Sequence, residues 1–94
     1  MKLEVARLIV GAPDGWSVRH LGKQLVFLSP MDSRPSREIV YTLRKDGSVI
    51  YMDYYENGTF HREDGPAVTA YDESGNIIEE LSYIHGKIVQ RKMP

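Results

Sequence analysis

The sequence predicts an all-β protein, an antiparallel meander of β-hairpins with about six to eight strands. The first observation is a series of turn signals. These are two-residue pairs that end in glycine and recur along the chain, and most of them are of the types that form tight hairpin turns. These pairs are Asp14-Gly15, Leu21-Gly22, Asp46-Gly47, Asn57-Gly58, Asp64-Gly65, Ser74-Gly75 and His85-Gly86. The second is that the runs between them, such as EIVYTL and SVIYMDYY, are rich in the β-branched and aromatic residues that strands favour. No convincing segment of helical periodicity remains, so we expect strands throughout.

The chain of 94 residues is predicted to form one domain with four parts. Residues 1–28 are an expected N-terminal β segment, because LEVARLIV and KQLVFLS both resemble strands. Residues 29–38, SPMDSRPSRE, are rich in Pro and Ser and are predicted to be a loop. Residues 39–66 and 67–94 are two copies of a repeat, and the N-terminal segment is expected to pair with or cap the first copy.

The repeat is a duplication with a period of 28 residues, in which Gly47 and Gly58 recur as Gly75 and Gly86. Other equivalent pairs are Val40 and Val68, Ile50 and Ile78, Tyr55 and Tyr83, and Pro66 and Pro94. Each copy is predicted to contain a strand, a glycine turn, a longer strand, a second glycine turn and a short strand. Such a unit cannot bury its apolar face alone, so the copies should lie side by side in one sheet.

Composition limits the classes of function. The absence of cysteine excludes disulfides and thiolate metal sites and favours a cytoplasmic location. The apolar run from Leu8 to Val10 is too short for a signal peptide or a membrane span, so we expect no membrane association. The net charge is −1, and residues 48–94 hold four Lys and Arg against eight Asp and Glu. Nucleic-acid binding is not expected, because it requires basic residues interleaved with aromatic ones.

The stretch YYENGTFHREDGPA, residues 54–67, resembles the repeat of MORN-like and YwqK-like proteins, in which Tyr-Tyr-x-Asn-Gly precedes His-Arg-x-Asp-Gly-Pro-Ala. The resemblance covers about residues 39–91. The second copy departs from it, because Val89-Gln90 replaces His61-Arg62 and Met93 replaces Gly65. The resemblance implies a β-hairpin array used for contact, as in small accessory proteins of bacteria and phages that act as inhibitors or antitoxin-like modules.

The candidates for chemistry are His61, Glu63 and Asp64, because imidazole and carboxylate groups suit divalent metals and proton transfer. Strand alternation places only His61 and Glu63 on one face, and His85 has no partner fixed by the sequence. The structural interpretation is that Asp64 opens a turn while His61 or Arg62 pairs across strands. The loss of His61 and Arg62 from the second copy favours this interpretation. We therefore predict no catalytic residue, no metal and no cofactor.

The tyrosines are candidates for binding, because tyrosine buries a large rigid ring and keeps a polar tip. Tyr55 and Tyr83 occupy equivalent repeat positions and are expected in the core. Tyr51 and Tyr54 have no aromatic equivalent in the second copy and are better candidates for an interface. The predicted interface residues are Tyr51, Tyr54, His61, Arg62 and Glu63.

We therefore predict a non-enzymatic protein-binding module, expected to be a phage or mobile-element accessory protein that inhibits or sequesters a host factor. Two other hypotheses stay open. One is a small metal-binding protein or hydrolase that uses His61 and Glu63, and the other is a self-assembling structural subunit. Because an open sheet has unpaired edges, its edge strands would also allow a homodimer.

Overall fold

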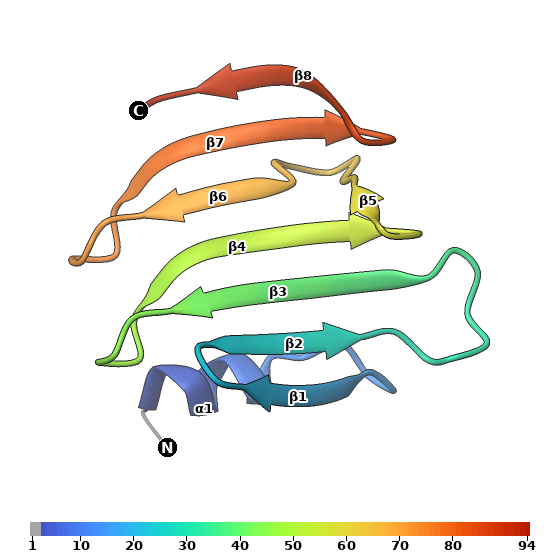
Figure 1. The fold of residues 1–94 in the computed structure, drawn as a ribbon, viewed down its shortest axis with the longest axis horizontal. Helices are drawn as coiled ribbons and strands as arrows, with labels where there is room; N and C mark the ends of the chain where they lie inside the picture. Colours follow the sequence, from blue (N-terminus) through green and yellow to red (C-terminus); the bar gives the residue numbers. More distant parts are fainter. Residues whose placement is uncertain (1–2) are drawn as a thin grey trace.

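The computed structural model describes residues 3–94, which form one helix and a single eight-stranded antiparallel sheet. The elements are α1 (Leu3–Val10), β1 (Ser17–Leu21), β2 (Gln24–Leu28), β3 (Arg37–Leu43), β4 (Val49–Glu56), β5 (Thr59–Phe60), β6 (Val68–Tyr71), β7 (Ile77–Ile84) and β8 (Lys87–Lys92). The strand order is β1-β2-β3-β4-β6-β7-β8, and the short β5 pairs with one end of β4 (Figure 1). The predicted all-β class and the hairpin meander are confirmed.

The expected strand at the N-terminus is wrong, because residues 3–10 form the helix α1. Val5, Leu8 and Ile9 follow the i, i+3, i+4 spacing that places side chains on one side of a helix. The β-branched residues of this segment favour a strand locally, but the helix buries Val5 against the sheet and leaves Val10 exposed. Gly11 and Pro13 follow the last turn, where such residues commonly end a helix.

The hydrophobic core lies between α1 and one face of the sheet. Its buried members are Val5, Leu25, Phe27, Ile39 and Leu43. Trp16, Tyr41, Met52 and Tyr54 pack against this cluster and extend it onto β4. The helix lies at the β1–β2 end of the sheet, whereas the β6–β8 end has no helix beside it (Figure 1).

The two repeat copies have the same backbone conformation at their long strands and at the turns that follow these strands. β4 and β7 contain eight residues each, and their first residues are 28 positions apart. Asn57 and Gly58 have φ angles of 50° and 82°, and His85 and Gly86 have nearly the same values, 49° and 80°. Positive φ at both central residues defines the type I′ turn, whose twist matches the twist of the flanking strands. The turn signals at these two positions therefore act as the sequence suggests.

The copies differ after this turn. In the second copy β8 runs beside β7 for six residues, whereas β5 runs beside β4 for only two. The chain then leaves the sheet and returns as β6 on the same side of β4. This return places the second copy beside the first in one continuous sheet. β8 does not leave the sheet and forms its edge.

Replacing Val5 by Ala should lower the free energy of unfolding by about 2 kcal/mol, from lost apolar burial and the cavity left behind. Val5 is 2% exposed and Val10 is 87% exposed. Val10→Ala on the same helix is the matched control, and its effect should stay within about 0.5 kcal/mol. Urea denaturation measures both values. Equal effects would contradict the packing of α1 on the sheet.

Candidate functional site

Residues 61–67 of the predicted motif form an excursion of the chain between β5 and β6, and we call it the excursion loop. Both of its ends bond to Tyr54. The His61 N–H donates to the Tyr54 carbonyl at 3.2 Å, and the Tyr54 N–H donates to the Ala67 carbonyl at 2.7 Å. On the other side, the N–H groups of Arg62 and Ala67 donate to carbonyls of β7 at 3.2 and 2.9 Å. The loop is thus held between β4 and β7.

Arg62 closes the excursion loop from within. Its Nε donates to Asp64 Oδ1 at 2.9 Å, and its Nη1 donates to the Pro66 carbonyl at 3.2 Å. The guanidinium carbon lies 3.9 Å from the centre of the Tyr54 ring, a cation–π contact. Gly65 leaves room for this side chain, because a Cβ at that position would lie 3.1 Å from Arg62 Cζ. The motif residues therefore stabilise the loop.

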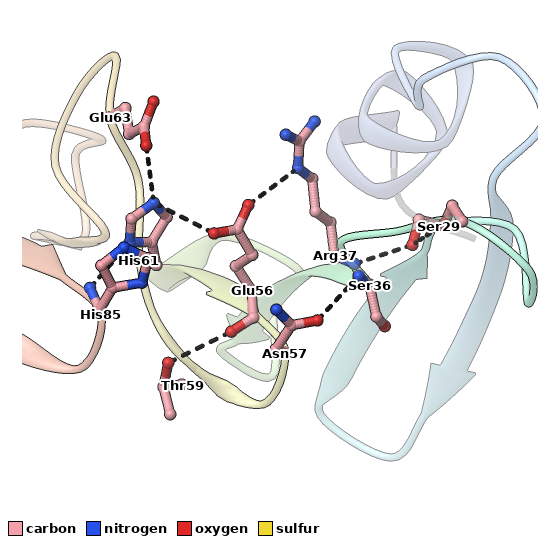
Figure 2. A network of polar contacts seen from close by, with 10 residues as sticks. Ser29, Ser36, Arg37, Glu56, Asn57, Thr59, His61, Glu63 and His85 are labelled. Atoms are coloured by element: carbon pink, nitrogen blue, oxygen red, sulfur yellow. Dashed lines mark hydrogen bonds and ion pairs between the residues drawn. The ribbon is translucent and has the colours of Figure 1, made fainter.

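His61 lies buried at the start of this loop, with 4% of its side chain exposed. Its Nε2 is 3.2 Å from Glu56 Oε2 and 3.4 Å from Glu63 Oε1. Glu56 also contacts Arg37, with 3.5 Å between Oε1 and Nε. The His85 ring stacks on the His61 ring with 4.4 Å between their centres. Figure 2 shows His61 between the two carboxylates, with His85 against its ring.

A main-chain hydrogen bond determines the tautomer of His61. The His85 N–H donates to His61 Nδ1 at 2.8 Å. Because a main-chain N–H can only donate, Nδ1 must be the unprotonated acceptor of the ring. The neutral ring therefore carries its proton on Nε2 and donates it towards Glu56. This bond also links the excursion loop of the first copy to the turn of the second.

Glu56, His61 and His85 each offer an atom that could bind a metal, and these atoms lie within 4.8 Å of one another. A metal at His61 Nε2 requires the lone pair of that nitrogen, which would move the proton to Nδ1. There the proton would face the His85 N–H donor. The same bond opposes proton abstraction by Nε2, because that nitrogen already carries a proton. The geometry favours a structural link over a metal or acid–base site.

Sequence reasoning missed Glu56 as a partner of His61. The two-residue turn at Asn57-Gly58 pairs Glu56 with Thr59 and therefore makes His61 the next cross-strand neighbour of Tyr54. In this register Glu56 and His61 are diagonal neighbours on one face. The hairpin register was the signal that would have identified this contact.

The five predicted interface residues do not form one surface. Tyr54, His61 and Arg62 belong to the packed interior of the excursion loop. Glu63 is 81% exposed at its side chain. Tyr51 is 44% exposed and projects from the other face of the sheet, because it alternates with Met52 and Tyr54 along β4.

The face of the sheet opposite α1, which we call the open face, is mostly apolar at its centre and carries Arg19 and Arg91 at its two edges. Cross-strand register places one row on it: Val26, Val40, Asp53, Val68 and Leu81. The flanking rows contribute Tyr51, Tyr55, Phe60 and Tyr83. Tyr55 and Tyr83, expected in the core, lie half-buried here and pack on Phe60 with ring centres 4.8 and 5.0 Å apart. The helix and its core cluster occupy the other face.

Asp53 is the acidic residue at the centre of the open face. Burial raises the pKa of its carboxyl above the ordinary value. Burial also raises the pKa of Tyr55, and the negative charges of Asp53 and Glu38 contribute to that shift. The charge of Asp53 therefore raises the pKa of the neighbouring Tyr55 hydroxyl on this face.

Comparison of the chain with protein-family models, with curated proteins and with solved structures gave no match. The resemblance to MORN-like and YwqK-like repeats stays a prediction. Among the described residues, no helix has the length and apolar character needed to cross a membrane.

We predict that the His61 ring is protonated on Nε2 and unprotonated on Nδ1, which ¹H–¹⁵N correlation spectra of the imidazole report directly. Adding zinc should leave these signals in place, because Nδ1 holds the His85 N–H bond. His85→Asn is a suitable control, since it removes the second ring but keeps the main-chain donor. Stoichiometric zinc binding that His61→Asn abolishes would contradict this assignment.

Asp53→Asn should make the protein more stable than the wild type at neutral pH, because a raised pKa means that folding disfavours the ionised carboxylate. The advantage should shrink as the pH falls through the raised pKa towards the ordinary value of about 3.8, where Asp53 is protonated in both states. Denaturation at a series of pH values measures it.

Asp64 gives the opposite control, because its bond to Arg62 lowers the pKa of its carboxyl. Asp64→Asn should lose stability above the ordinary pKa, and this loss should diminish at lower pH as the wild-type carboxylate becomes protonated. If the stability differences of Asp53→Asn and Asp64→Asn from the wild type changed with pH in the same direction, the two carboxylates would not lie in opposite environments.

Proposed function

We propose that the protein is a non-enzymatic module that binds another protein through the open face of its sheet. The observation that carries this proposal is the apolar, tyrosine-bearing surface opposite α1. Tyr51 is 44% exposed, and Tyr55, Leu81 and Tyr83 are half-buried on the same face. Tyrosine is enriched at protein interfaces because it combines a large apolar ring with a hydroxyl that can bond across the contact.

The chemistry of the excursion loop supports binding over catalysis. The groups that suggested a metal or hydrolytic site are occupied by one another: His61 bonds to the His85 N–H and faces Glu56, and Arg62 bonds within its own loop. A reactive site requires a free lone pair or a free donor aimed at a substrate. The open face has no such competing internal role.

The edge strands favour a different protein over a second copy as the partner. The sheet ends at β1 and β8. β8 carries Lys87 and Lys92 among six exposed residues, and β1 carries the exposed Arg19. Edge-to-edge pairing of two copies would bring these like charges together, which natural sheets use to prevent such pairing. We therefore propose a monomeric module instead of a homodimer or a self-assembling subunit.

The cellular setting is part of the same proposal. The absence of cysteine supports a reducing compartment, so we propose that the module acts in the cytoplasm. The resemblance of residues 54–67 to bacterial and phage repeats supports a role as an accessory protein that inhibits or sequesters a host factor.

Tyr51→Glu should weaken partner binding by about tenfold or more, because an interface tyrosine often contributes over 1 kcal/mol and the new charge must be desolvated. The measurement is affinity capture from bacterial lysate, followed by titration of the captured protein. Val10→Glu is the matched control, because it places the same charge on the exposed Val10 of α1, away from the open face. Both variants should show the circular dichroism of the wild type.

Equal capture by Tyr51→Glu and the wild type would contradict binding through the open face. Light scattering of the purified protein measures its oligomeric state and so tests for self-assembly, and we expect a monomer. A discrete oligomer at every concentration would instead support the self-assembling subunit.

A further inference from the structure

Asp53 lies between two tyrosines along β4. Tyr51, Asp53 and Tyr55 occupy alternate positions of this strand, so their side chains share the open face. Across the strands, the neighbours of Asp53 are Val40 and Val68. The nearest positions to this half-buried carboxylate on the open face are therefore two tyrosines along the strand and two valines across it.

This carboxylate has no partner among the residues that the structure describes. Among residues 3–94, Asp53 forms no hydrogen bond or ion pair, and burial alone accounts for the direction in which the pKa of its carboxyl departs from the ordinary value. A partly buried charge without a partner opposes folding. A cation that approaches from outside would offset this free-energy cost of the Asp53 charge, because the open face leaves the outer side of the carboxylate accessible.

The second copy shows what the fold places here when no carboxylate is present. The residue equivalent to Asp53 is Leu81, which lies beside Val68 on the same face. Glu79 stands where the first copy has Tyr51, while Tyr83 is equivalent to Tyr55. The backbone of β4 and β7 is the same, so leucine fits this position of the repeat. Asp53 is thus not required to build the strand.

We propose that Tyr51, Asp53 and Tyr55 form a binding site for a lysine or arginine side chain of the partner protein, an inference that rests on the proposed function of the open face. The carboxylate supplies the opposite charge. Tyr51, 44% exposed, offers an aromatic ring to the cation, and the half-buried Tyr55 and Val68 offer apolar surface to its methylene stem. The partner segment presents one basic residue among apolar ones, because the positions next to Asp53 on this face are Tyr51, Tyr55, Val40 and Val68.

The test uses a display library of random short peptides, selected on the full-length wild type, on Asp53→Leu and on Asp53→Asn. Selection on the wild type should enrich peptides with Lys or Arg at one fixed position and apolar residues on both sides. Which of the two basic residues is enriched identifies the preferred cation. Selection on Asp53→Leu should enrich peptides without that basic residue.

A synthetic copy of an enriched peptide should bind Asp53→Leu and Asp53→Asn about tenfold to a hundredfold more weakly than the wild type, the loss expected for one charge-assisted contact. Glu38→Gln is the matched control. It removes a carboxylate from the same face, opposite Tyr55, and should leave the affinity unchanged. Asp53→Leu should also unfold at a higher denaturant concentration than the wild type, which shows that the loss of binding is not a loss of fold.

The outcomes separate this inference from the proposed function. Enriched peptides that lack a basic residue, or that bind Asp53→Leu as well as the wild type, would overturn the cation site and leave the open face as a binding surface. If no peptide is enriched on the wild type while a known peptide-binding protein succeeds in parallel, both the cation site and the proposed function fail.

Discussion

The two main-chain hydrogen bonds of Tyr54 at the ends of the excursion loop determine how the halves of this protein join. If β5 continued along β4 with the register shift that β8 shows against β7, Glu63 would lie opposite Asp53, just as Arg91 lies opposite Leu81 in the second copy. Two carboxylates directly opposite each other destabilise a sheet. The chain instead leaves the sheet after His61, and Val68 takes the position beside Asp53. The loop thereby gives β4 an apolar neighbour and starts the second copy in register.

This connection explains why a cluster of His, Arg, Glu and Asp occurs in a protein for which we propose no reaction. Each charged or polar group of the cluster has an internal task. Arg62 closes the loop, Asp64 bonds to Arg62, and His61 links the first copy to the turn of the second. The second copy ends the sheet and needs no such connection, and there the motif is replaced by the continuous edge strand β8. We propose that binding takes place on the opposite face of the sheet, where Asp53 has no partner among the described residues.

Much of the fold could be predicted from the sequence, because the turns and the repeat are determined by residues close together in the chain. Asn57-Gly58 and His85-Gly86 form the two-residue turns that such pairs favour, and the duplication appears as two strands of equal length. The helix α1 was missed because Val5, Ile9 and Val10 favour a strand locally, while contact with the sheet favours a helix. That contact joins residues far apart in the sequence.

The site was less predictable, because it depends on register. Glu56 reaches His61 through the pairing of β4 with β5, and the His85 N–H reaches His61 from the next hairpin. The importance of Asp53 emerges only when the two faces of the sheet are known. Its place among Tyr51, Tyr55 and the valines follows from cross-strand neighbours that no short motif records.

The most direct test of this account is native-state hydrogen exchange of Arg62→Ala compared with the wild type. If the motif is a structural connection, the amides of Tyr54 and Ala67 and those of β6 and β7 should exchange faster together, while β2 and β3 keep their protection. Unchanged exchange throughout the sheet would contradict the account, because Arg62 would then be free to serve a site instead of the fold.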